Sequence, residues 1–211
     1  MLATLTRQLA KALADPRPQE RDAGAERILD AALEQFLHIG INRSSMEDVA
    51  RRAGVSRITI YRRFPQKDRL VEAVLLREVR RQILGLREVL GTIPEADKRI
   101  EVAFVFMLRS MRNHPVTRLM TLEPDLVLPF MTLKGAPLIA IGTGFIAEQI
   151  RAGQREGAFP KYDPQPVAEI LTRLAHSLLL TPQGGIPLMT DGQARAFARS
   201  HILPLLRHGD G

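Results

Sequence analysis

Apolar side chains recur every three to four residues along most of the chain, and no segment shows a convincing alternation of apolar and polar positions. From Asp22 to His38 the apolar residues share one helical face, and Gly40 is a suitable stop after them. The pattern therefore predicts an all-α protein. The expected helices cover residues 22–38, 46–53, 56–64, 68–90 and 95–113, two within 116–155, then 166–180 and 191–207.

Two of these helices are short and are joined by a tight turn. The first has a capping signal at its start, either Ser45 with Asp48 or the Ser44–Glu47 pair beside it. Gly54 permits the left-handed turn that ends this helix, and Ser56 can cap the next one. Short helices joined in this way predict a helix-turn-helix unit.

On a helical wheel of residues 56–64, Ile60 and Phe64 face the core, whereas Ile58, Thr59 and Arg62 face outward. An outward isoleucine suits contact with a thymine methyl group, and an arginine can donate two hydrogen bonds to guanine. The pattern thus favours a helix that enters the major groove of DNA. In the alternative, Ile58 packs on the first helix and the arginines are only solvated.

Net charge supports a polyanion partner at the N-terminal end. The formal charge is +7, of which residues 1–81 carry +5 and residues 82–211 carry +2. A solvated surface with a basic bias explains the same numbers. Lys67, at the start of the helix from 68, is placed to bind a phosphate, although Asp68 could simply neutralise it. Tyr61 could reach a phosphate or pack its ring on the second short helix, and Arg43 could add a phosphate or minor-groove contact.

Other protein classes find little support. Cysteine is absent, which excludes disulfides and thiolate metal sites and suits a reducing cytoplasm. The five histidines are scattered, so we expect no metal site, no catalytic residue and no cofactor. The longest uncharged apolar run, 135–147, is shorter than the roughly 18 residues that span a bilayer. We therefore expect no membrane association, and an enzyme or a lipid carrier is the weakest hypothesis.

Residues 27–74 resemble the N-terminal domain of TetR-family transcriptional regulators. The residues that carry the resemblance are Gly40, Ser44, Ser45, Ala50, Gly54, Val55, Ser56, Thr59, Tyr61, Phe64 and Lys67. The resemblance implies base contacts from Arg57, Ile58, Thr59 and Arg62. It implies phosphate contacts from Ser45, Tyr61 and Lys67, to which Arg43 and Arg63 are added for their position.

The sequence predicts a basic arm over 1–21, and the resemblance implies a helix-turn-helix DNA-binding domain over 22–67 and a larger helical ligand-binding and dimerisation domain over 68–211. The last two helices each carry an apolar stripe, and two such helices from each of two subunits would form a four-helix interface. Packing within one chain is the alternative. The predicted interface residues are Val167, Ile170, Leu171, Leu174, Leu178, Phe197, Ala198 and Ile202.

An inducer pocket is a further implication of the resemblance. Soft apolar side chains are frequent between residues 102 and 145, which suggests an apolar or amphipathic ligand. The predicted pocket residues are Glu101, Val105, Phe106, Arg109, Asn113, His114, Met120, Phe130, Met131 and Phe145. The expected function is thus a cytoplasmic homodimeric repressor of an inverted-repeat operator on double-stranded DNA, released by a ligand. A constitutive DNA-binding regulator with a filled core is the alternative.

Overall fold

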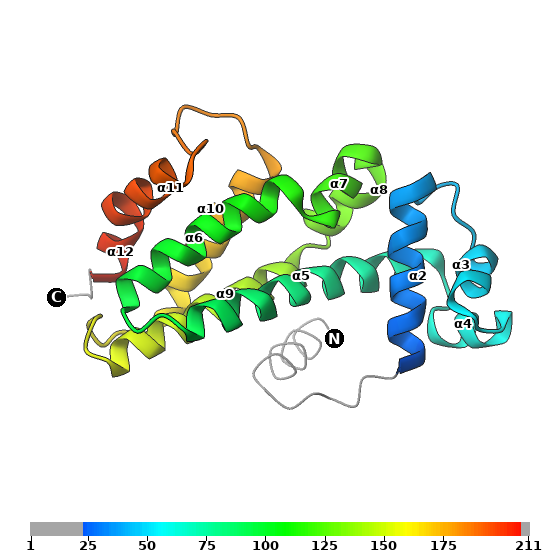
Figure 1. Cartoon of the computed structure of the whole chain (residues 1–211), viewed down its shortest axis with the longest axis horizontal. Helices are drawn as coiled ribbons and strands as arrows, with labels where there is room; N and C mark the ends of the chain where they lie inside the picture. Colours follow the sequence, from blue (N-terminus) through cyan, green and yellow to red (C-terminus); the bar gives the residue numbers. More distant parts are fainter. Residues whose placement is uncertain (1–22, 208–211) are drawn as a thin grey trace. The chain divides into compact units, whose positions relative to one another are not determined.

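The computed structural model describes residues 23–207, and within that range it contains helices and no strand, which confirms the all-α prediction (Figure 1). The predicted basic arm over 1–21 lies outside the described residues. The helices are α2 (Ala23–Ile39), α3 (Met46–Ala53), α4 (Arg57–Arg63), α5 (Lys67–Gly91), α6 (Ala96–Asn113), α7 (Pro115–Leu122), α8 (Pro124–Met131), α9 (Ala136–Arg155), α10 (Pro164–Leu180), α11 (Asp191–Phe197), the π-helical segment η1 (Ala198–Ile202) and α12 (Leu203–Arg207).

The described residues form two compact units, and neither is a continuous stretch of chain. The head unit comprises residues 23–81 and 113–135, and the bundle unit comprises residues 82–112 and 136–207. The expected boundary at residue 67 differs from this division for two reasons. Helix α5 continues through both units, and α7 packs against α2, so residues 113–135 join the N-terminal helices.

The head unit is built on α2, whose buried side chains Ile28 and Phe36 share a core with Val49 of α3 and Ile60 of α4. A buried arginine, Arg77 of α5, links α5 to α2. Its guanidinium lies 2.8 Å from the Asp30 carboxylate, 2.9 Å from Glu78 and 3.7 Å from Glu26. Arg81 is in the same network, 3.1 Å from Glu26 and 3.0 Å from Asp30. These ion pairs hold the base of α2 against the helix that leads into the second unit.

The bundle unit is held together by α9 and α10, which lie side by side, with α6 and the C-terminal helices around them (Figure 1). Two glycines of α9 permit the close approach. A Cβ added at Gly142 would lie 2.7 Å from Thr172 Cγ2, and one at Gly153 would lie 2.5 Å from Cε2 of the buried Phe159 ring. Small residues are therefore required where α9 meets its neighbours.

Prolines account for the main difference from the predicted helices. Residues 116–155 form three helices, not two, because Pro115 and Pro124 begin α7 and α8 instead of interrupting a helix. Proline suits a first helical position, since its fixed φ is compatible and its missing N–H would have no partner there. Pro164 begins α10 in the same way, two residues before the predicted start. The last predicted helix, 191–207, contains the π-helical segment η1.

Among residues 23–207, no single helix has the length and apolar composition needed to cross a membrane, although the bent pair α8 and α9 would meet that test together. In the same range, no three His, Asp or Glu side chains are grouped so that they could hold a metal ion.

Gly153 should tolerate a methyl group poorly. We expect Gly153→Ala to lower the free energy of unfolding by about 1–3 kcal/mol, because the added Cβ overlaps the Phe159 ring in a packed core. Gly144→Ala is the matched control in the same helix. No atom lies within 4 Å of its Cβ position, so this change should raise stability by up to about 1 kcal/mol. Urea unfolding of both variants measures the difference, and equal effects would contradict the packing described.

Candidate nucleic-acid interface and ligand cavity

The turn between α3 and α4 forms through three local interactions that the sequence predicted. The Ser45 hydroxyl oxygen accepts a hydrogen bond from Asp48 N at 3.0 Å, so Ser45, and not the neighbouring Ser44, caps α3. Gly54 ends the helix with φ +65°, in the left-handed region that glycine adopts without strain. Ser56 caps α4 by accepting from Thr59 N at 3.1 Å. The two short helices are thus fixed by their own caps.

Helix α4 presents one face to solvent. Ile60 is fully buried, whereas Ile58 is 80% exposed and Arg62 is exposed beside it. Thr59 is half-buried, and its hydroxyl lies 2.9 Å from the Ser56 hydroxyl. Within residues 23–207, Arg62 has no carboxylate partner. The exposure of Ile58 is incompatible with the alternative in which this side chain packs on α2.

Glu47 of α3 engages two of the predicted DNA contacts. Its Oε1 accepts hydrogen bonds from Arg57 at 2.7 Å and from the Tyr61 hydroxyl at 3.1 Å. A hydrogen bond from its own backbone amide, the Tyr61 hydroxyl and the Arg57 charge lower the pKa of Glu47. Donation to this carboxylate raises the pKa of Tyr61 in turn. Arg57 and Tyr61 are therefore held together on the α3–α4 surface by one ionised carboxylate, which the sequence reasoning had not assigned to the site.

A second carboxylate, Glu123, holds the loop that precedes α3. Asn42 N–H donates to both of its oxygens, at 3.0 and 3.2 Å. Gly40, at φ +88°, leaves room for this contact, because a Cβ there would overlap Glu123 Oε1. Lys67 Nζ donates to the Asn42 carbonyl oxygen at 3.1 Å. Burial lowers the pKa of Lys67, while the Glu123 and Asp68 carboxylates act in the opposite direction.

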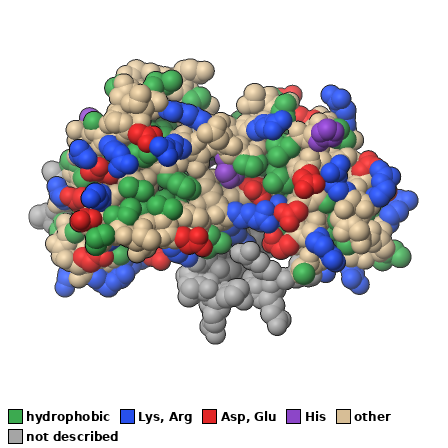
Figure 2. All heavy atoms as spheres, viewed as in Figure 1, with side chains coloured by type: hydrophobic (Ala, Val, Ile, Leu, Met, Phe, Trp, Pro, Cys, Tyr) green, Lys and Arg blue, Asp and Glu red, His purple; other side chains and the backbone are tan. Residues whose placement is uncertain are grey.

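The remaining predicted phosphate contacts lie around this surface. Arg43 is exposed, Arg63 is half-buried and Ser45 is engaged in its cap. Lys67 is half-buried and donates to the Asn42 loop, so the structure gives it a structural contact that the sequence did not predict. Figure 2 shows Lys and Arg side chains over α3 and α4, with acidic side chains among them. The arrangement is a basic surface with carboxylates that orient its cations.

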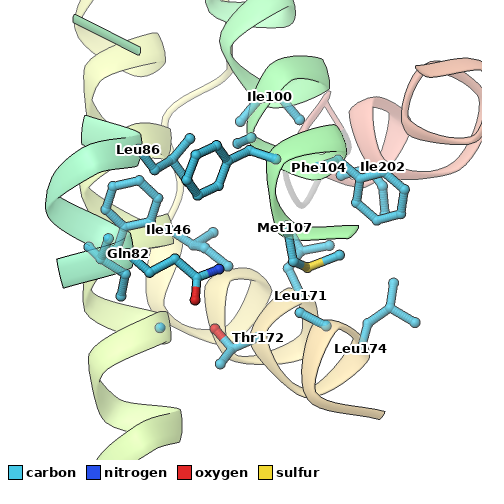
Figure 3. Close-up of a pocket in the computed structure, with 16 residues that line it drawn as sticks. Gln82, Leu86, Ile100, Phe104, Met107, Ile146, Leu171, Thr172, Leu174 and Ile202 are labelled. Atoms are coloured by element: carbon cyan, nitrogen blue, oxygen red, sulfur yellow. The ribbon is translucent and has the colours of Figure 1, made fainter. Parts of the chain in front are cut away.

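The bundle unit contains an apolar cavity of about 190 Å³ (Figure 3). Helices α5, α6, α9 and α10 and the residue Ile202 supply its wall, and none of the side chains in that wall is charged. The sequence reasoning did not identify Gln82 and Thr172, which place an amide and a hydroxyl in the wall. The lining residues are Gln82, Ile83, Leu86, Ile100, Ala103, Phe104, Phe106, Met107, Gly142, Phe145, Ile146, Leu171, Thr172, Leu174, Ala175 and Ile202.

Only Phe106 and Phe145 of the predicted pocket residues line this cavity. Val105 is buried in the core, Glu101 pairs with Arg199 at 2.6 Å, and Arg109 pairs with Asp191 at 2.5 Å. The other predicted pocket residues belong to the head unit and cannot line a cavity formed by the bundle unit alone. These are Asn113, the α7 cap His114, Met120, the buried Met131 and Phe130, over whose ring Lys134 Nζ lies at 4.6 Å.

The predicted dimer residues separate into two groups. Leu171, Ala198 and Ile202 are buried in the core of their own chain, so they have packing partners within the subunit, and their place in a dimer interface stays a prediction. Ile170 is 59% exposed. Val167, Leu174, Leu178 and Phe197 are half-buried at the edge of the same core. The rotation of each helix about its own axis decides which apolar residues face the core and which remain accessible. The apolar stripes in the sequence did not reveal this rotation.

Known proteins share both the sequence of the helix-turn-helix and the fold of the chain. Residues 28–74, from within α2 to within α5, match the sequence family described as bacterial regulatory proteins, tetR family. The chain is 36% identical over 83 residues to the HTH-type transcriptional activator FasR of Mycolicibacterium smegmatis, covering 39% of this chain and 38% of that protein. The matched stretch spans less than half of the length of the first curated relatives.

Solved structures share the fold at low sequence identity. The TetR-family repressor AlkX from Dietzia, implicated in biodegradation of n-alkanes, superposes with a TM-score of 0.65 at 21% identity, over 89% of this chain and 99% of that chain. RolR in complex with resorcinol gives 0.62 at 16% identity, over 90% of each chain.

The helix-turn-helix of this chain is thus similar to the DNA-binding domain of bacterial regulatory proteins. Residues 28–74 match the TetR family in sequence, and solved TetR-family proteins share the fold of most of the chain.

The hydrogen bond between Tyr61 and Glu47 has a measurable consequence. Glu47→Gln removes the negative charge that disfavours the phenolate, so the pKa of Tyr61 should fall toward its ordinary value. Absorbance titration of the phenolate band measures this change, with Tyr162 as the internal reference because it belongs to the other unit. Glu72→Gln, a carboxylate paired with Arg69, is the control and should leave the titration unchanged. Identical curves for all three proteins would refute the contact.

Proposed function

We propose that this protein is a homodimeric, sequence-specific DNA-binding repressor that reads an inverted-repeat operator and is released by a small, mainly apolar ligand. Its place of action is the cytoplasm, where the operator lies, and no membrane partner is part of the proposal. The observation that carries the proposal is the outward face of α4, where Ile58 is 80% exposed and Arg62 has no carboxylate partner among the described residues.

This face suits direct readout of base edges. An exposed isoleucine has no favourable contact on a surface that meets only water. In a major groove, the isoleucine could contact a thymine methyl group while the unpaired arginine beside it donates hydrogen bonds to a guanine. Thr59 extends the same face. Glu47 keeps Arg57 and Tyr61 oriented before DNA binds. On binding, both side chains would leave the Glu47 carboxylate and contact the DNA instead. Arg43, Ser45, Arg63 and Lys67 are the proposed phosphate contacts around the reading face, and phosphate contacts fix register while base contacts specify sequence.

The cavity supports a ligand response over the constitutive alternative. A constitutive regulator with a filled core has no need of an apolar space of about 190 Å³. Helix α5 begins at Lys67 and places Gln82, Ile83 and Leu86 in the cavity wall. At about 1.5 Å per residue, roughly 22 Å of one helix separates Lys67 from Gln82. A ligand that moves α5 would therefore move Lys67 and change the spacing between the two DNA-binding helix pairs of a dimer. AlkX is a repressor, and RolR binds resorcinol, within the same fold.

The dimer part of the proposal rests on α10. Ile170 is exposed, and Val167, Leu174 and Leu178 continue its stripe along the helix with partial exposure. Phe197 of α11, which is half-buried, and the exposed Leu205 of α12 are further accessible apolar side chains of the C-terminal helices. Two copies of such a surface related by a two-fold axis form an isologous interface, and a two-fold dimer reads an inverted repeat.

The proposal is tested by footprinting the full chain on DNA that flanks its own gene, with competitor DNA, at several salt concentrations. We expect protection of an inverted repeat and an affinity that falls steeply with salt, because phosphate contacts release counterions. In the same assay, Arg62→Ala should relax the preference at one base pair of each half-site by about 1–3 kcal/mol.

Arg69→Ala is the matched control for that substitution. Arg69 is also an exposed arginine of the head unit, but it lies in α5 and pairs with Glu72 at 3.0 Å. Its removal should leave base preference unchanged. If Arg62→Ala leaves the preference unchanged as well, Arg62 does not read a base, and equal, weak binding to all sequences would refute the operator reading as a whole.

The dimer surface yields a separate prediction. Ile170→Asp places a carboxylate in the proposed apolar interface, where it lacks a partner, so the dimer dissociation constant should rise at least tenfold. Ile186→Asp, at a 43% exposed position in the loop before α11, is the control and should leave the dimer intact. Light scattering after gel filtration measures the mass over a concentration series. A dimer that persists unchanged in Ile170→Asp would place the interface elsewhere.

A further inference from the structure

The cavity wall contains no charged side chain. Of its sixteen lining residues, thirteen are aliphatic, aromatic or Met side chains, and one is Gly142. The two hydrogen-bonding side chains are the amide of Gln82 on α5 and the hydroxyl of Thr172 on α10. Figure 3 shows both groups turned toward the same part of the cavity, with the apolar side chains around them. The cavity thus has one polar spot in an otherwise apolar wall.

Two charged residues close to the cavity in the chain, Glu101 and Arg109, are already neutralised. Glu101, next to the lining residue Ile100, accepts two hydrogen bonds from Arg199, at 2.6 and 2.9 Å. Arg109 is bound by Asp191 in the same two-pronged manner. Neither pair contributes to the wall, and neither leaves a counter-ion for a charged ligand. A ligand that carried an ionised group into this space would lose its hydration without gaining an ionic partner.

The polar spot has unused hydrogen-bonding capacity. Thr172 donates its hydroxyl proton to the Ala168 carbonyl oxygen at 2.8 Å and accepts from the Thr143 hydroxyl at 3.4 Å, so toward the cavity the Thr172 oxygen can only accept, with one lone pair left. The Gln82 amide makes no hydrogen bond to any residue in the range 23–207, and it offers both a donor and an acceptor. A hydroxyl or similar neutral group at this point could donate to one oxygen and accept from the amide.

We infer that the cavity selects an uncharged, mainly apolar molecule that carries one hydrogen-bonding group, and that it discriminates against the corresponding carboxylate. Gln82 is the residue that binds the polar group. The inference rests on the proposed function, because it specifies the chemical class of the ligand that the cavity was proposed to hold. It goes further in excluding fatty and aromatic acids that share the same apolar skeleton.

Size sets a second limit on the ligand. An apolar cavity of roughly 150 Å³ is known to accept benzene, so a space of about 190 Å³ suits a single ring or a short chain with a few further atoms. The rings of Phe104, Phe106 and Phe145 in the wall can pack on a flat ligand as well as on an aliphatic one. A molecule of on the order of ten non-hydrogen atoms is the expected size.

Three probes with one skeleton test the inference: 3-phenylpropan-1-ol, propylbenzene and 3-phenylpropanoate. Each is titrated into the full chain without DNA, by calorimetry or ligand-observed NMR. We expect the alcohol to bind at least tenfold more tightly than the carboxylate, with propylbenzene between them. Equal or tighter binding of the carboxylate would overturn the inference, as would the failure of all three probes to bind.

Two variants assign the polar contact to Gln82. Gln82→Leu should weaken the alcohol about tenfold and leave propylbenzene unchanged, because it removes the hydrogen bond and keeps the apolar wall. Gln165→Leu, at an exposed glutamine of α10 outside the cavity, is the control and should bind all probes as the parent does. An unchanged ratio of alcohol to propylbenzene in Gln82→Leu would remove Gln82 from the site.

Binding of the protein to its operator is measured with and without each probe. This measurement distinguishes a failure of the proposed repressor function from a failure of the inferred ligand selectivity. If the alcohol binds in the expected order but the chain has no operator, or keeps its operator in the presence of the alcohol, the repressor function fails and the ligand selectivity stands. If the chain binds an operator and the probes show no preference for the neutral molecule, the selectivity fails and the DNA-binding function stands.

Discussion

The exposure of Ile58 and Arg62 on α4 depends on the buried guanidinium of Arg77. This group is 7% exposed and is neutralised by Asp30 and Glu26 on α2 and by Glu78 on its own helix. Because α3 packs on α2 and α4 packs on α3, the ion pairs at the base of α2 fix the frame that exposes Ile58. Without Arg77, the buried Glu78 carboxylate would keep only Arg81, at 3.4 Å, and breaking a buried ion pair typically costs about 3–5 kcal/mol. The frame thus depends on Arg77 more than on any one of its carboxylate partners.

Local signals allowed much of this fold to be predicted. Ser45, Gly54 and Ser56 each act through neighbours within four residues, so their roles follow from spacing alone. The helical wheel of α4 placed Ile60 inside and Ile58 outside for the same reason. Proline is ambiguous by comparison, because it ends a helix at one position and begins one at another. Pro115 and Pro124 begin helices here, and only the surrounding structure distinguishes the two cases.

The sites were harder to predict where their partners are remote in sequence. Glu123 binds Asn42 across 81 residues, and no local pattern relates the two. The soft apolar residues between 102 and 145 indicated a pocket, but helical periodicity does not tell which of two buried faces meets an open space. Phe106 and Phe145 do line the cavity, whereas Val105 enters the core one residue away. Gln82 could not be predicted as a cavity residue, because nothing in the sequence distinguishes it from the other polar residues of α5.

The contact between Glu123 and the Asn42 loop bears on how such regulators could be recombined. A chimaera that grafts residues 28–74 onto the helical bundle of another protein would take Gly40, Asn42 and Lys67 without the carboxylate that binds their loop. In the transplanted loop, the Asn42 N–H would lose its acceptor. Gly40 would keep its left-handed conformation although no side chain packs against it. Exchange of DNA specificity in this protein therefore requires two segments, with 113–135 moved alongside the recognition helices.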